Sequence, residues 1–104
     1  MTTTELLPPV QPGAILAEDF LKPLGITPYK LAKDIDVPES RIYSILRGTR
    51  SITADTDLRL CRYFGLSNGY WLRAQMLHDL EVATQTLGGQ LLQIKPIGSR
   101  FAGA

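Results

Sequence analysis

The stretch from Thr27 to Arg50, TPYKLAKDIDVPESRIYSILRGTR, constrains the fold of this chain more than any other part of its sequence. Thr27 followed by Pro28 is a typical helix start, because threonine accepts a bond from a free N–H at the helix end and proline fits the first turn. Apolar residues then recur at helical spacing in two groups, which are Leu31, Ala32 and Ile35, and Ile42, Ile45 and Leu46. The stretch therefore predicts two short helices, each of which needs packing partners to be stable.

The break between the two groups predicts a tight turn. Asp36 ends the first of these helices, and Val37-Pro38 begins the second. Gly48 is a typical C-terminal stop, because glycine adopts the left-handed backbone that closes many helices. Ala32 is small, which lets the following helix cross close by.

The rest of the chain predicts three more helices. One begins at Pro12, carries apolar residues at helical spacing, and ends at Pro23 and Gly25; its apolar residues are Ile15, Leu16, Phe20 and Leu21. Thr53 caps another, which is lined by Leu58, Cys61 and Phe64 and closed by Gly65. Ser67 or Asn68 opens the last and longest, which runs to Leu87. Leu91–Ile94 is a short apolar run that could form a strand.

These elements predict an all-α bundle of five helices with a longer fifth helix and a short extended C-terminal tail. Residues 1–11 are expected to be a flexible N-terminal arm, because Pro8 and Pro9 oppose helix. Residues 12–87 form the helical domain, and residues 88–104 form the tail. A chain of 104 residues is long enough for one modest core.

Charge is concentrated in the middle of the chain. Between Lys22 and Arg73 there are nine basic and five acidic residues, a net charge of +4, while the whole chain carries +1. A basic middle is a weak indication of a nucleic-acid partner. Scattered, solvated charge explains the count equally well.

Several functional classes are disfavoured by the composition. The single cysteine, Cys61, allows no intrachain disulfide or cysteine cluster and fits a buried position. The single histidine, His78, has no partners at the spacing of a metal site or a catalytic pair, so we expect a packing or surface role. A phosphate-binding glycine loop is also missing. We therefore expect a protein that is not an enzyme and needs no cofactor or metal.

The cellular location is predicted from the lack of a signal peptide and of a membrane-spanning segment in the sequence. The first ten residues have no basic region before an apolar stretch, so they do not resemble a signal peptide. No run approaches the roughly 20 apolar residues needed to span a bilayer. We expect a soluble, cytoplasmic protein with no membrane partner.

A pair of short helices in this arrangement is the usual device for placing a helix in the DNA major groove. The polar residues left on the outside of the second helix are Glu39, Ser40, Arg41, Tyr43, Ser44 and Arg47. Arginine can bond guanine with two parallel hydrogen bonds, serine can bond bases or phosphates, and glutamate can only accept. Lys30, Arg47, Thr49 and Arg50 flank the helix, where phosphate contacts would position the domain. The alternative is a pair of solvated helices in an all-α protein that never contacts DNA.

The longest helix carries a second apolar stripe, which consists of Leu72, Met76, Leu80, Ala83 and Leu87. A two-fold seam along it would place two groove-binding helices one DNA turn apart. The stripe could instead cover the protein's own core. Tyr70, Trp71 and Leu72, at the start of this helix, are expected to pack in the core.

With these motifs in place, the Thr27–Arg50 stretch resembles the lambda-repressor-like, Xre-type helix–turn–helix. The span Gln11–Ala83 is similar to the HigA antitoxin family, through PGAILAEDFLKPLGIT, LAKDIDVPESRIYSILRG, SITADTDLRLCRYFG and YWLRAQMLHDLEVA. The last segment is the most specific, because a generic repressor domain has no reason to carry it.

The resemblance implies an antitoxin of a type II toxin–antitoxin pair that binds a HigB-like, RelE-type ribonuclease toxin. It also implies a homodimer that represses its own operon at a double-stranded, palindromic operator. The family's base-contacting positions fall on Glu39, Ser40 and Ser44, with Tyr43 beside them. Its phosphate-contacting positions fall on Thr27, the neighbours of Pro28, Arg47 and the loop to Arg50.

Two positions depart from the family pattern. Asp36 stands where the turn usually has glycine, and Pro38 stands where the second helix usually opens with serine or threonine. Pro38 has no hydroxyl to cap the helix or touch a phosphate. These departures leave open a protein-interaction module with degenerate DNA binding. A stand-alone regulator of other genes, with no toxin, is a further alternative.

Overall fold

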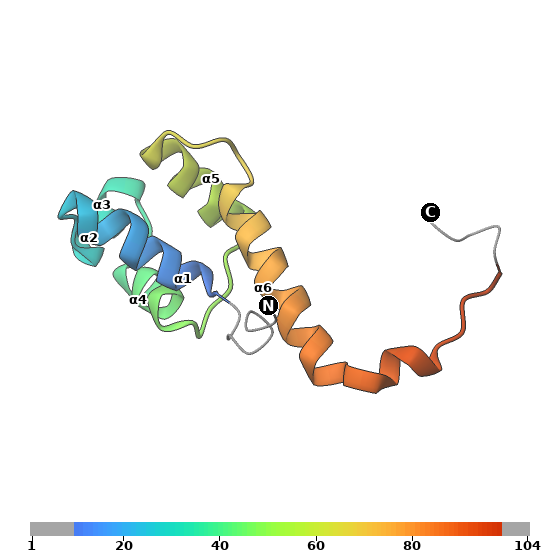
Figure 1. Cartoon of the computed structure of the whole chain (residues 1–104). Helices are drawn as coiled ribbons and strands as arrows, with labels where there is room; N and C mark the ends of the chain where they lie inside the picture. Colours follow the sequence, from blue (N-terminus) through green and yellow to red (C-terminus); the bar gives the residue numbers. More distant parts are fainter. Residues whose placement is uncertain (1–9, 99–104) are drawn as a thin grey trace.

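The structure is a computed structural model that describes residues 10–98, and every regular element in that range is helical. The first helical run consists of α1 (Pro12–Ile15), the π-helical segment η2 (Leu16–Leu21) and α2 (Lys22–Leu24), with right-handed helical backbone at both joins. The remaining elements are α3 (Pro28–Ile35), α4 (Glu39–Arg47), α5 (Ala54–Phe64), α6 (Tyr70–Leu87) and the 3-10 segment η3 (Gly88–Gln93). With the first run taken as one helix, the predicted all-α bundle of five helices is confirmed over the described range (Figure 1).

The predicted termini are only partly described. Most of the predicted N-terminal arm, residues 1–9, and the end of the predicted tail, residues 99–104, lie outside the described residues. None of the helices within residues 10–98 is both long and apolar enough to cross a membrane.

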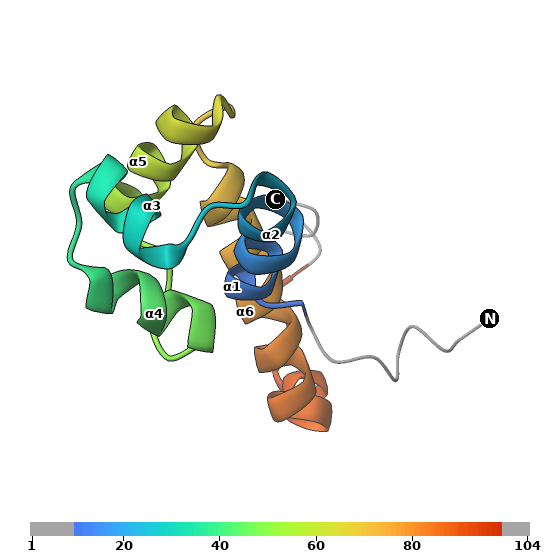
Figure 2. The same ribbon diagram turned by 90° about the vertical axis from the view of Figure 1, so that its left-hand side faces the viewer.

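The core lies where the first run, α3, α4, α5 and the start of α6 meet. α3 contacts α4 and α5, and α1 contacts α4 and α6 (Figure 2). The residues with no exposed surface at the centre are Leu16, Leu31, Ile42, Leu60, Cys61 and Trp71. Phe20, Phe64 and Tyr70 surround Trp71, with ring centroids 5.1 to 6.4 Å from the Trp71 ring. The predicted core positions of Tyr70, Trp71, Leu72 and Cys61 are thus confirmed.

Gly13 allows α1 to lie directly against the end of α4. A Cβ atom at this position would lie only 2.1 Å from the carbonyl oxygen of Ile45. Any side chain here would therefore push α1 and α4 apart, so the glycine fixes how closely they pack.

The helix ends follow the predicted signals. The Thr27 hydroxyl accepts a hydrogen bond from the N–H of Lys30 at 3.1 Å, and the Thr53 hydroxyl accepts one from the N–H of Thr56 at 3.4 Å. Gly48 ends α4 in the left-handed conformation (φ 79°), as the sequence predicted. Side-chain caps thus begin α3 and α5, and a glycine ends α4.

The predicted inner face of α5 was partly wrong. Leu58 is 50% exposed, whereas Thr56, Asp57, Leu60 and Cys61 face the interior. The helix is rotated so that Asp57 is directed inwards to a polar contact with α6. A pattern of apolar residues does not reveal a buried polar contact. The spacing of apolar residues therefore assigned Leu58, and not Asp57, to the inner face.

The predicted start of α6 and the possible strand were also wrong. α6 begins at Tyr70, after Gly69 in the left-handed conformation, and not at Ser67 or Asn68. The run Leu91–Ile94 lies mostly in the 3-10 segment η3. A strand needs a neighbouring strand to satisfy its backbone groups, and the described part of the chain offers only helices.

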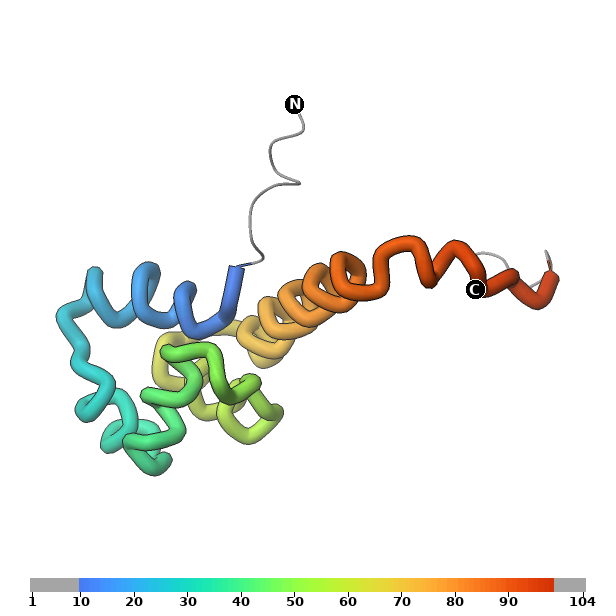
Figure 3. The backbone as a smooth tube through the Cα atoms, turned by 90° about the horizontal axis from the view of Figure 1, so that it is seen from below, coloured from blue at the N-terminus to red at the C-terminus, as the bar shows by residue number. Residues whose placement is uncertain are grey.

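The second half of α6 leaves the bundle. Figures 1 and 3 show this helix and η3 projecting beyond the other helices. Leu72 packs against the core, but Met76 is 52% and Leu80 57% exposed, and Ala83 and Leu87 are exposed as well. Most of the predicted apolar stripe therefore does not cover the core of its own chain.

Candidate nucleic-acid interface

The turn between α3 and α4 is held in a left-handed conformation by an aspartate. Asp36 has φ 58°, the only positive φ of a non-glycine residue within residues 10–98. Its N–H donates to the Lys33 carbonyl at 3.3 Å, and the N–H of Val37 donates to the Ala32 carbonyl at 3.0 Å. These are the bonds that usually close a helix at a glycine, and aspartate is one of the few other residues found there.

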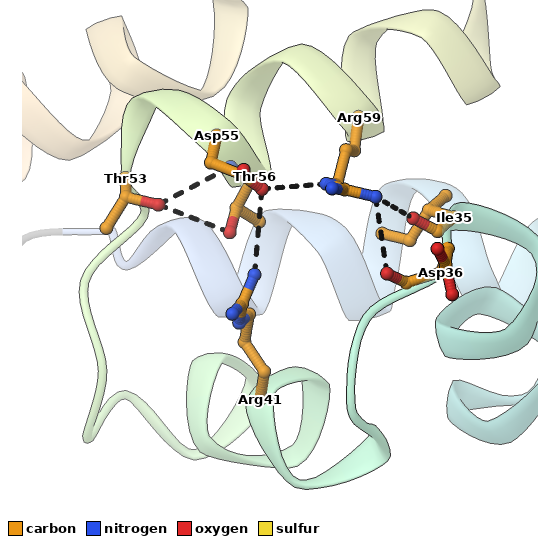
Figure 4. Close-up of polar contacts among 7 residues, drawn as sticks. All are labelled: Ile35, Asp36, Arg41, Thr53, Asp55, Thr56 and Arg59. Carbon is orange, nitrogen blue, oxygen red and sulfur yellow. Dashed lines mark hydrogen bonds and ion pairs between the residues drawn. The ribbon is translucent and has the colours of Figure 1, made fainter.

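Arg59 on α5 fixes this turn from the side. One guanidinium nitrogen, Nη1, donates to the carbonyl oxygens of Ile35 at 2.8 Å and Asp36 at 3.2 Å, while Nε donates to Asp55 at 2.7 Å (Figure 4). The carbonyl groups at the end of α3 are thereby satisfied. Arg59 therefore offsets part of the cost of having Asp36 where glycine would be easier.

α4 begins without a side-chain cap. Pro38 has the extended backbone of a capping residue (φ −61°, ψ 141°), but its side chain accepts no bond from the helix. Glu39 follows in the first turn, where negative charge is favourable beside the helix dipole. The start of α4 is thus set by proline geometry and charge.

One face of α4 is turned to solvent. Ile42 and Ile45 are buried on the opposite side, beneath α1 and α3. The polar residues at helical spacing on the outer face are Glu39, Ser40, Tyr43, Ser44 and Arg47, all exposed except the half-buried Ser44. We refer to these five residues as the α4 outer face. It offers acceptors, hydroxyl groups, an aromatic ring and a guanidinium along one side of a helix.

Arg41 is the predicted residue that does not belong to the α4 outer face. Its side chain is 28% exposed and lies between α4 and α5, with Nη1 3.7 Å from the Asp55 carboxylate (Figure 4). Its Nε is buried and has no hydrogen-bond partner. In this structure Arg41 helps to join α4 to α5.

The predicted flanking residues lie at the two ends of the unit. Thr27 caps α3, with Pro28 and Lys30 in its first turn. The loop after α4 bends back, because the N–H and the hydroxyl of Thr49 both donate to the Ser44 carbonyl, at 2.9 and 3.2 Å. Arg50 follows, exposed.

Lys30 takes part in an exposed polar network. Its ammonium lies 2.9 Å from the Asp34 carboxylate, which also accepts a hydrogen bond from the Tyr63 hydroxyl at 2.6 Å. The bond from Tyr63, followed by the bond from Lys30, lowers the pKa of Asp34 below its ordinary value. The hydrogen bond to the same carboxylate and its negative charge raise the pKa of Lys30. The positive charge of Lys30 is therefore partly balanced by Asp34.

His78 lies on α6, half-buried, with Nδ1 3.3 Å from the Asp79 carboxylate. Residues 10–98 contain no group of three or more His, Cys, Asp or Glu side chains placed to hold a metal ion.

Asp57 is a structural residue that the sequence reasoning missed. It is 1% exposed, and its two carboxylate oxygens accept hydrogen bonds from the N–H groups of Gly69, Trp71 and Leu72, at 2.7, 2.8 and 3.0 Å. One side chain of α5 thus caps the start of α6. A carboxylate at the inward spacing shared with Leu60 and Cys61 was the signal in the sequence.

Comparison with known proteins places this geometry in a family. Residues 18–71 match the helix–turn–helix family model. The chain is 49% identical to virulence-associated protein I of Dichelobacter nodosus, over 76% of this chain and 73% of that protein.

Solved structures are similar over most of this chain. The addiction module antidote protein of the HigA family from Coxiella burnetii is 37% identical, with a TM-score of 0.81, over 86% of this chain and 99% of that one. Antitoxin HigA of Pseudomonas aeruginosa, solved with the higBA promoter, is 35% identical, with the same TM-score and coverage. The chain therefore belongs to the lambda-repressor-like helix–turn–helix family and, within it, to the HigA-type antitoxins.

Proposed function

We propose that this protein is the antitoxin of a type II toxin–antitoxin pair in the cytoplasm, where it binds a HigB-like ribonuclease toxin and represses its own operon. The α4 outer face carries this proposal. It is a solvated polar stripe on the second helix of a helix–turn–helix, in a family with a member solved on promoter DNA. The protein acts by binding and not as an enzyme.

On DNA, α4 enters the major groove with its outer face towards the bases. Glu39, Ser40 and Ser44 read base edges, with Tyr43 beside them. Arg47 and Arg50 neutralise phosphates on one flank, with Thr49 between them in the chain, while the start of α3 at Thr27 and Pro28 meets the backbone on the other. Such phosphate contacts set the register of the helix without reading sequence.

A homodimer delivers two copies of α4 to a palindromic operator. The seam we propose is the exposed stripe of α6 at Met76, Leu80, Ala83 and Leu87, which continues from the partly buried Leu72. Its burial against a second copy would remove apolar surface from water, the main driving force for association.

Promoter titrations test the groove assignment. Arg47→Ala should weaken binding to all sequences and reduce the slope of log K against log salt by about one. Arg62→Ala, which removes the same charge from the exposed side of α5, is the matched control and should have a smaller effect on the slope. If the two variants behave alike, overall charge and not an α4 contact governs binding.

Ser44→Ala should instead change which operator is preferred, at a cost of about 1–3 kcal/mol for each lost base contact. Binding to a library of operator variants measures this change. If both Ser44→Ala and Ser40→Ala keep the operator preference of the wild type, neither serine contacts the bases.

The second candidate is a protein-interaction module that no longer binds DNA. The uncapped start of α4 at Pro38 and the negative charges of Asp36 and Glu39 favour it, because they remove a phosphate donor and repel phosphates. A stable complex with the toxin and no retention of promoter DNA at low salt would support this function over the first.

A further inference from the structure

The loop between α4 and α5, residues 48–53, is joined to α6 through one side chain. The Oε1 atom of Gln75 accepts a hydrogen bond from the N–H of Ile52 at 3.0 Å, and its Nε2 donates to the Asp79 carboxylate at 2.8 Å. The side chain of Ile52 is buried in the core. Because Asp79 accepts from the nitrogen end of the amide, the oxygen end is held towards the loop.

Gln75 supplies a hydrogen-bond acceptor for the middle of this loop. The beginning of the loop is bonded back to α4 through Gly48 and Thr49, and its end is fixed where Thr53 caps α5. Ile52 lies between these points. A backbone N–H beside a buried side chain needs a partner, and the one it has belongs to α6.

The loop and α6 also face each other across a small cavity of about 80 Å³. Gly48, Arg50 and Ser51 line it from the loop, and Gln75, His78 and Asp79 line it from α6. Gln11, Pro12 and Gly13 close the cavity from the start of α1. Within residues 10–98, the bond from the N–H of Ile52 to Gln75 is the hydrogen bond that links this loop to α6.

α6 is held to the bundle a second time at its start, where Asp57 binds three of its backbone N–H groups. Asp57 binds the first turn of α6, and Gln75 lies in its second turn. Together they fix the direction in which α6 leaves the bundle relative to α4 and its following loop.

From these contacts we infer that Gln75 is a positioning residue, which sets the half-site spacing that the dimer accepts on DNA. The inference rests on the proposed function. If two copies meet along α6, the separation of their α4 helices depends on the angle between α6 and the helix–turn–helix unit. Gln75 fixes that angle through the loop after α4, which also carries Arg50, one of the residues proposed to contact phosphates.

The test measures binding of the full-length protein to promoter fragments in which the half-sites are moved together or apart by single base pairs. Wild type should strongly prefer one spacing, because the two α4 helices are held at a fixed separation. Gln75→Met has similar length but no acceptor for Ile52. It should stay dimeric, bind the best spacing about three- to tenfold more weakly, and lose most of the preference among spacings.

Two further variants make the result specific. Gln85→Met changes an exposed glutamine later on α6 and should keep the wild-type spacing curve. The double variant Gln75→Glu with Asp79→Asn keeps the net charge and an acceptor for Ile52, and its new amide at position 79 can donate to the new carboxylate. It should restore the wild-type curve.

A dimeric Gln75→Met variant with the wild-type spacing curve would overturn the inference and leave the proposed function intact. If Gln75→Met does not fold, the double variant decides: a folded dimer with a flattened curve would overturn the inference just as well. Failure of the wild type to bind any fragment would remove the proposed function, and the inference with it.

Discussion

Asp57 illustrates how a single buried carboxylate connects two helices. It accepts from three backbone N–H groups at the start of α6, none of which has an intrahelical partner. A neutral amide presents an N–H₂ group to at least one of these donors. Asp57→Asn should therefore lower the free energy of unfolding by about 1–3 kcal/mol.

Urea unfolding measures this loss. Asp19→Asn is the matched control, since it makes the same change at an exposed position of the first helical run. Equal stabilities for the two variants would contradict a capping role for Asp57.

Asp34 should make stability depend on pH. The bond from Tyr63 and then that from Lys30 lower its pKa in the folded state, so its ionised form stabilises the fold. That contribution is complete above the unfolded pKa, about 3.9. It is lost as the pH falls through the lower folded pKa. The stability difference between wild type and Asp34→Asn should therefore shrink as the pH is lowered from about 6 to about 3.

Urea midpoints across this range provide the measurement. Tyr63→Phe removes the largest cause of the shift and should move the acid transition of the wild type to higher pH. A difference between wild type and Asp34→Asn that stays constant with pH would show that the network does not alter the acidity of Asp34.

At the level of elements, the turn before α4 depends on α5. Arg59 bonds the carbonyl groups of Ile35 and Asp36 as well as Asp55. Its side chain is 39% exposed, so these bonds are partly screened by water. Arg59→Met should cost about 1–2 kcal/mol and speed amide hydrogen exchange at Asp36 and Val37 more than in α1.

Exchange measured residue by residue tests this local effect. Arg62→Met, at an exposed position of the same helix, serves as the comparison and should leave exchange in the turn unchanged. A uniform increase over the whole chain in Arg59→Met would mean that Arg59 stabilises the fold without holding the turn.

Local signals in the sequence predicted most elements but not the contacts between them. Thr27, Thr53 and Gly48 act on neighbouring residues, so their roles follow from the chain itself. Arg59 and Asp57 act on backbone groups that are 12 to 24 residues away, and only the packed structure brings them together. The rotation of α5 that exposes Leu58 belongs to this second kind of information.

The candidate site was predicted to a similar degree. The apolar spacing of α4 identified its outer face. Ile42 and Ile45 mark the side of the helix that is buried, so the positions on the opposite side are left in solvent. It could not separate Arg41 from that face, since a long side chain can turn back towards Asp55. The tail was misjudged because strand formation depends on a pairing partner elsewhere in the molecule.

For the molecule as a whole, the projecting half of α6 carries the proposed dimer seam. A leucine buried there contributes about 1.5–3 kcal/mol, and each dimer contains two copies. Leu80→Gln should therefore raise the dimer dissociation constant on the order of a hundredfold or more. Glutamine adds no charge, so the accompanying loss of operator affinity cannot come from repulsion by phosphate.

Sedimentation at several concentrations measures the dissociation constant. Leu77→Gln is the informative comparison, because Leu77 is even more exposed, at 64%, but lies outside the proposed stripe. Dissociation by Leu77→Gln alone would place the seam on another side of α6.

The close approach of Gly13 to Ile45 affects how proteins of this type can diversify. α4 is supported from beneath by a backbone-to-backbone contact and by buried isoleucines, none of which uses an outward side chain. The outward positions can therefore be exchanged without refitting the scaffold. We expect lineages to acquire new operators through a few substitutions on that surface, while position 13 accepts almost none. Paralogues in one cell could in this way avoid cross-talk while keeping a common architecture.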